Sequence, residues 1–297
     1  RLLAVVSEIA ASRLDEGYER GVHDVDAAQI LGQLLPSFEA AGPLRFTARA
    51  RALALMFTAE LTTEERTVLT RRAASVARLA TVLGDPRGVS ALKSELGPRI
   101  RTYAEGVGLT PGPSEAEDAA DVVVETLGAH IPRFPVARAS DEGHKLLRRK
   151  LDDAGQTRAL ADELRILAGR PRERAELALH YAASLGVLAP PLAPFAPEIA
   201  AILLTDGALD RDVLSAETTL EIKGLLGTHE RIRDGALSLE LAELLVRLRH
   251  FEVVTAARFR VFRTRRTELL ARERERMRLA ELVPKVLSSF VRNRLIS

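Results

Sequence analysis

The sequence contains no cysteine and no tryptophan, and its twelve phenylalanine and tyrosine residues make up only 4% of 297 positions. The absence of cysteine excludes disulfide frameworks, thiolate zinc sites and cysteine nucleophiles, and it permits a reducing compartment. The low aromatic content argues against a β-sandwich or barrel, because strands favour aromatic and β-branched side chains. No apolar run reaches the roughly 18 residues of a membrane span, and the first residues lack a signal-peptide pattern. We therefore expect a cytoplasmic protein with no membrane partner.

Motifs that carry catalytic or cofactor chemistry are also missing. The phosphate-binding pattern Gly-x-x-x-x-Gly-Lys-Ser/Thr is absent, since the nearest approach at Lys93 has Arg87 and Leu92 in place of the glycines. No Gly-x-Ser-x-Gly nucleophile motif occurs, and the six histidines are scattered without metal-ligand spacing. The acidic pairs 24/26 and 152/153 have no motif-placed histidine or lysine partner. We expect no catalytic residue, metal ligand or cofactor-binding residue in this sequence.

Helical signals dominate what the sequence does contain. Alanine, leucine, arginine and glutamate are abundant, 46% of residues are hydrophobic, and sustained alternation of period two is almost lacking. These features predict an all-α fold, either a helical bundle or an irregular array of α-hairpins, with a long basic C-terminal helix. Four prolines between residues 190 and 197 suggest a boundary. We expect a helical unit over 1–188, a proline-rich connector over 189–197, and a smaller helical unit over 198–297.

Capping residues and helix breakers give the expected boundaries of individual elements. Thr47 is expected to open one helix, and Thr62 with Glu65 forms a capping-box pattern for the next. Pro36 is expected to end a helix that Asp24 caps, and residues 130–139, which contain two prolines, are expected to be extended or looped. Helices are predicted over residues 2–18, 25–35, 47–61, 62–83, 118–127, 140–151, 157–168, 171–185, 198–204 and 215–226, from 238 to about 283, and again after Pro284.

Residues 74–96 resemble one unit of a HEAT-type α-solenoid, in which a tight turn such as Gly84-Asp85-Pro86 joins two helices. They also resemble a helix-turn-helix, although Pro86 and a weakly basic second helix argue against reading DNA. Because the unit does not recur at a fixed period, an ordinary helical hairpin in a bundle is the favoured interpretation.

Positive charge is concentrated near the C-terminal end. Residues 245–297 contain 14 basic and 5 acidic side chains, whereas the remainder of the chain has a net charge of −7. Arginines in this segment could neutralise phosphates of a nucleic acid, or the helix could simply be solvated, with its glutamates neutralising part of the charge. The candidate nucleic-acid-binding residues are Arg258, Arg263, Arg265, Arg266, Arg272 and Arg274.

Two stretches carry a resemblance to a known family. Residues 12–31 (SRLDEGYERGVHDVDAAQIL) and especially 284–297 (PKVLSSFVRNRLIS) resemble the region upstream of the ATPase core in large bacterial proteins called DNA repair ATPases, which carry an AAA-type domain. The resemblance implies that the sequence is a fragment of a longer bacterial chain, whose ATPase domain would be a partner and would bind ATP and Mg²⁺. No nucleotide-binding residue can be carried over, because no part of this sequence matches that motif.

These observations lead to two functional hypotheses. The first is a non-catalytic helical scaffold that couples to the ATPase domain of the parent chain through its long helix. The alternative is a nucleic-acid-binding helical module that uses the arginines between residues 258 and 278. An independent enzyme would require distant acids and histidines to assemble in a pocket.

Overall fold

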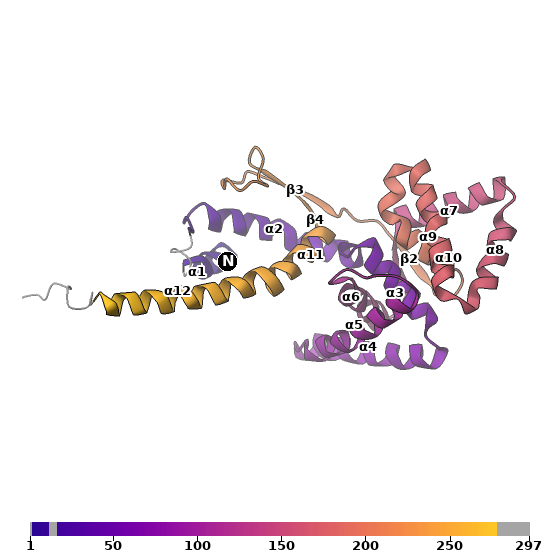
Figure 1. Ribbon diagram of the computed structural model, residues 1–297, viewed down its shortest axis with the longest axis horizontal. Helices are drawn as coiled ribbons and strands as arrows, with labels where there is room; N and C mark the ends of the chain where they lie inside the picture. Colours follow the sequence, from indigo (N-terminus) through magenta and orange to yellow (C-terminus); the bar gives the residue numbers. More distant parts are fainter. Residues whose placement is uncertain (1, 12–16, 278–297) are drawn as a thin grey trace, which may run out of the picture. The chain divides into compact units, whose positions relative to one another are not determined.

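The computed structural model describes residues 2–11 and 17–277, and these are predominantly helical (Figure 1). The chain divides into two compact units, residues 1–246 and 247–297. The α-helices are, in chain order, α1 (Leu2–Ala11), α2 (His23–Ala41), α3 (Ala48–Glu60), α4 (Thr63–Leu83), α5 (Arg87–Gly106), α6 (Glu115–Gly128), α7 (Arg138–Asp153), α8 (Thr157–Ile166), α9 (Pro171–Leu188), α10 (Ala196–Leu204), α11 (Leu241–His250) and α12 (Ala256–Arg276). The strands are β1 (Phe134–Ala137), β2 (Arg211–Leu214), β3 (Thr219–Lys223) and β4 (Ala236–Glu240). The predicted all-α class is confirmed, with two small sheets added to it.

Helix α3 lies at the centre of the first unit. Nine consecutive residues, 50–58, are buried, and seven of them are apolar, which suits a helix at the centre of a core. It packs against α5, α6, α10 and β1. The hydroxyl of Thr47 accepts a hydrogen bond from the Ala50 amide at 3.1 Å. Helix α3 therefore starts directly after Thr47, as this capping residue predicts.

Helices α4, α5 and α6 complete the larger hydrophobic core. The Thr62–Glu65 capping box is formed, and Gly84 ends α4 in the left-handed conformation with φ of 64°. Helices α4 and α5 therefore make the predicted hairpin. Because α6 packs against α3, α4 and α5 together, the arrangement is a bundle rather than a solenoid in which each unit meets only its neighbours. Ser114 makes no capping hydrogen bond from its side chain, and Glu115 instead accepts one from the Gly112 amide.

A second core lies among α7, α8, α9 and α10. The proline-rich residues expected to form a connector instead make a 3₁₀-helix, η4 (Pro190–Phe195), which packs on α7, α9 and α10. Leu192 and Phe195 join the hydrophobic cluster formed by these helices. The chain continues directly into α10, which packs on α3 and α9. Residues 189–197 thus lie inside the first unit, and the division into units comes after Val246 instead.

The two sheets correct the prediction of a helix over 215–226. Strand β1, within the segment expected to be extended, pairs in parallel with β2, and β3 pairs antiparallel with β4. In β3, Leu220 and Ile222 are the more buried residues and alternate with three exposed polar ones. This period of two is typical of a half-buried strand, but it extends over only five residues of the sequence. Ser238 lies within β4, and the helix predicted to begin there begins at Leu241.

Helix α2 passes through Pro36, which was expected to end it. A proline inside a helix loses the hydrogen bond to the carbonyl four residues earlier, here Gly32, and the cost was outweighed by burial of Leu34 and Ala41 against Leu241. At the start of α2, the buried Asp26 carboxylate accepts the amides of residues 226 and 227 at 2.9 and 2.7 Å. These bonds hold the β3–β4 loop against α2.

Helix α1 is described over Leu2–Ala11, residues 12–16 of the predicted helix lie outside the described residues, and residues 17 and 18 are not helical. Near the other end of the chain, α11 is followed by a π-helical turn, η5 (Phe251–Thr255), and then by α12. No described helix is long and apolar enough to cross a membrane. The predicted features after Met277, including the helix end at Pro284, lie outside the described residues, as do all of the stretch 284–297 and residues 12–16 of the stretch 12–31, which carry the resemblance.

Candidate functional site

Helix α12 carries an uneven distribution of charge along its length. It contains eight arginines and three glutamates, and none of its residues is buried. Between residues 253 and 267 there are five arginines and no acid, whereas residues 268–276 hold three arginines and three glutamates. The excess positive charge therefore belongs to the first half of the helix.

The six arginines predicted from the sequence do not share one face of α12. One row consists of Arg258, Arg265 and Arg272. These are seven residues apart, so the row drifts by only about 20° at each step. A second row consists of Arg263 and Arg274, eleven residues apart and roughly 140° around the helix from Arg258 at about 100° per residue. Arg266 lies between the rows. The predicted face is thus two arginine rows rather than one.

An apolar stripe separates the two arginine rows. It is formed by Phe259, Phe262, Leu269 and Leu270, each between 38% and 59% exposed. The two phenylalanine rings lie 6.2 Å apart between centroids, and the Arg266 side chain interrupts the stripe at its middle. A helix with exposed large apolar side chains flanked by one sign of charge has the pattern of a surface that binds a partner.

Ion pairs along α12 support the helix. Arg265 pairs with Glu268 at 3.2 Å and Arg276 with Glu273 at 2.8 Å, both three residues apart. Exposed pairs of this kind contribute about 0.3–0.5 kcal/mol each, so they leave the charge imbalance of the first half in place.

Acidic side chains from the pairs 24/26 and 152/153 accept hydrogen bonds within the fold, and one of the histidines is buried. Asp24 accepts hydrogen bonds from the Ser7 hydroxyl at 2.7 Å and from the Gly21 amide at 2.6 Å, and the first of these is the main cause that lowers its pKa. Asp152 accepts a hydrogen bond from the Thr157 hydroxyl. Within residues 2–11 and 17–277, no three histidine, aspartate or glutamate side chains are placed to hold a metal ion. Burial lowers the pKa of His144 below its ordinary value.

A buried ion pair was missed by the sequence analysis. Arg51 on α3 binds Glu198 on α10 through two parallel hydrogen bonds of 2.8 Å, and both side chains are almost fully buried. The Ser140 hydroxyl donates to the same carboxylate at 2.5 Å, and Arg51 also donates to the Phe46 carbonyl. The only sequence signal was a charged residue inside each of two apolar helical runs. The network joins α3, α7 and α10 and leaves neither charge free for chemistry.

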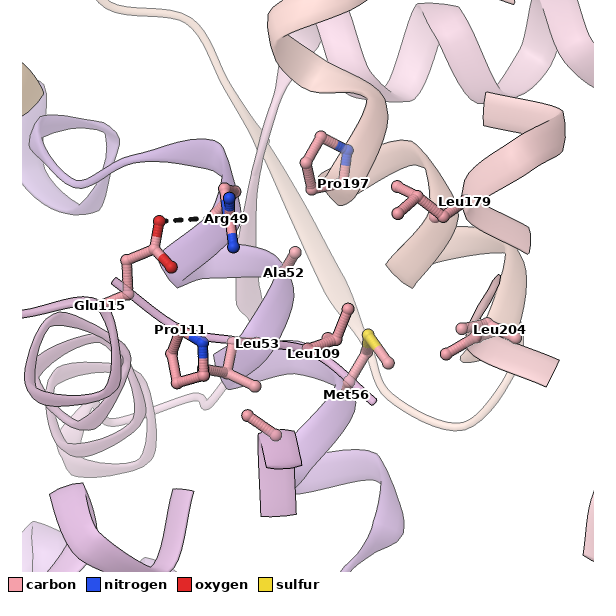
Figure 2. A pocket seen from close by; sticks show the side chains of 13 residues that line it. Arg49, Ala52, Leu53, Met56, Leu109, Pro111, Glu115, Leu179, Pro197 and Leu204 are labelled. Carbon is pink, nitrogen blue, oxygen red and sulfur yellow. Dashed lines mark ion pairs between the residues drawn. The ribbon is translucent and has the colours of Figure 1, made fainter. Parts of the chain in front are cut away.

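A cavity of about 170 Å³ lies between α3, α9 and α10 (Figure 2). Its walls are mostly apolar, and the only charged side chains that line it are Arg49 and Glu115, which form an ion pair at 3.1 Å. Figure 2 shows this pair at one side of the cavity and Leu179 and Leu204 at the other. No local sequence pattern predicts this cavity, because its lining comes from segments that are far apart in the chain.

Comparison of the chain with protein-family models, with curated proteins and with solved structures found no match.

Proposed function

We propose that the chain is a non-catalytic helical scaffold whose helix α12 couples it to a neighbouring module. The observation that carries this proposal is the exposed apolar stripe of α12, flanked by two arginine rows. Completing the burial of such side chains against a partner stabilises a complex by up to about 1.5–3 kcal/mol each. A helix with this pattern gains most from a partner surface that is apolar at its centre and acidic at its edges.

The resemblance of residues 284–297 to the region upstream of an AAA-type domain supports a particular module. Under this proposal the natural bacterial chain continues beyond Ser297 into an ATPase domain, which holds ATP and Mg²⁺ in the cytoplasm. The π-helical turn η5 precedes α12, and π-turns within helices are frequent at functional sites. The coupling role assigned to α12 is to transmit the position of one module to the other.

The test uses the longest natural chain that contains these residues. In one variant, Phe259, Phe262, Leu269 and Leu270 are changed to alanine. Alanine preserves helix propensity, so the variant removes the apolar stripe while α12 can still form. The matched control changes Val261 and Thr264 to alanine, since both residues are exposed on the opposite side of α12.

We expect the stripe variant to hydrolyse ATP at the rate of the ATPase domain without residues 1–297, and the control to keep the rate of the whole chain. Equal rates for wild type, stripe variant and control would overturn the coupling proposal. A natural chain without an ATP-hydrolysing domain would overturn it as well.

The second candidate function is nucleic-acid binding, favoured by the five arginines between residues 253 and 267. If they contact phosphates, affinity falls steeply with salt, with a slope of about 0.9 per contact on duplex DNA. Single- and double-stranded DNA and RNA are titrated with the wild-type chain across a salt series. One triple variant replaces Arg258, Arg263 and Arg265 with glutamine. The matched control replaces the same number of charges at Arg272, Arg274 and Arg276.

We expect the first triple variant to bind more weakly and with a smaller salt slope than the control. Equal effects of the two triple variants would remove this candidate. The absence of binding by the wild type at about 50 mM salt would remove it as well, because phosphate contacts are strong at low salt.

A further inference from the structure

The cavity in the first unit has the features of a small-molecule binding site, and no residue of α12 lines it. It lies where the two hydrophobic cores meet, since Ala52 and Met56 belong to one core and Ala200 and Leu179 to the other. Four of the buried lining positions are alanine. They are Ala52, Ala104, Ala175 and Ala200. Small side chains from four separate segments leave this space unfilled, although protein interiors are otherwise close-packed.

At the polar edge of the cavity, the positive charge of Arg49 and the negative charge of Glu115 neutralise each other. Arg49 pairs with Glu115 and donates to the Thr110 carbonyl at 3.0 Å, and Glu115 accepts the Gly112 amide at 2.7 Å. A charged ligand would lose its hydration without meeting a free opposite charge. A neutral N–H or O–H group could still donate to the Glu115 carboxylate, which has acceptor positions to spare.

We propose that this cavity binds a small neutral molecule with a compact apolar body and one polar group, which lies at the Arg49–Glu115 pair. The volume decides the size of the ligand. An apolar cavity of about 150 Å³ stays dry and binds benzene, so about 170 Å³ accommodates a body of one or two fused rings or a short hydrocarbon chain. Such small ligands bind with dissociation constants of about 10 µM to 1 mM.

The experiment uses indole as the probe, toluene as the probe without a polar group, and benzoate as the charged probe. The chain has two methionines, and only Met56 lines the cavity, whereas Met277 lies in the second unit. Labelled methionine methyl groups therefore give one reporter in the cavity and one internal control. We expect indole to shift the Met56 signal in a saturable way without moving Met277, toluene to bind more weakly, and benzoate to bind at least about tenfold more weakly.

Two variants fill the cavity from different helices, Ala200→Leu on α10 and Ala175→Leu on α9. The control is Ala183→Leu, an exposed position on α9. We expect each filling variant to weaken indole binding at least about tenfold at an unchanged or higher unfolding temperature, because new apolar contacts replace the void. The control should bind as the wild type does.

The wild-type measurement decides the proposal even if a filling variant fails to fold. No saturable shift of Met56 at millimolar indole, or equal shifts of Met56 and Met277, would overturn it. Undiminished binding to a folded filling variant would also overturn it, since the ligand would then lie elsewhere.

Discussion

Replacement of Glu198 by glutamine tests the role of the buried ion pair most sharply. The change keeps the size of the side chain and removes its charge, so the Arg51 guanidinium stays buried without an anionic partner. Both side chains are no more than 4% exposed, and their two hydrogen bonds are both 2.8 Å long. Breaking a buried pair by removing one partner costs about 3–5 kcal/mol. For a unit of this size, that lowers the unfolding temperature by roughly 6–20 °C.

The assay is urea unfolding of wild type and Glu198→Gln, with Glu117→Gln as the matched control. Glu117 pairs with Arg101 at 2.9 Å on the surface, where such pairs contribute at most about 1 kcal/mol. We also expect the double variant Arg51→Met/Glu198→Met to be more stable than Glu198→Gln, because it leaves no unpaired buried charge. A loss below about 1 kcal/mol for Glu198→Gln would refute this reasoning.

Three further predictions follow from single residues. Burial lowers the pKa of His144 below the value of about 6.5 in the unfolded chain, so unfolding takes up a proton and stability falls as pH decreases through 6.5. His144→Gln should flatten that slope in urea midpoints between pH 8 and 5.5, and an unaltered slope would contradict it. Thr62→Ala removes the capping box of α4 and should cost about 1 kcal/mol in urea unfolding, whereas no measurable change would show that the cap is unimportant. Asp26→Ala should speed hydrogen exchange at the amides of residues 226 and 227 at least about tenfold. Unchanged exchange there would contradict the role of Asp26 in holding the β3–β4 loop against α2.

Helix starts were predictable where one side chain determines them. Thr47 and Thr62 accept hydrogen bonds from amides three residues away, so each contact lies within four consecutive residues of the sequence. Pro36 misled the prediction because the loss of one hydrogen bond is small beside the burial of Leu34 and Ala41, which depends on α11 far along the chain. The strands β2 and β3 were missed because each has only four or five residues, too few for a clear period.

The features that define a site depended on contacts between distant residues. Arg51 and Glu198 are 147 positions apart, and the cavity is lined from α3 to α10. The arginines of α12 were readable from the sequence, whereas their division into two rows required the helix to be placed residue by residue. The grouping of Leu269 and Leu270 with Phe259 and Phe262 in one exposed stripe likewise required the helix to be placed residue by residue.

The most direct test of the proposed coupling is hydrogen–deuterium exchange of α12. It compares residues 1–297 alone with the longest natural chain that contains them. In residues 1–297, we expect the amides of α12 to exchange fast, because no side chain of the helix is buried. In the longer chain, packing of the apolar stripe should slow exchange over 256–276 by at least about tenfold, while exchange in α3 stays unchanged. Equal exchange of α12 in both chains would contradict the claim that this helix couples the scaffold to a neighbouring module.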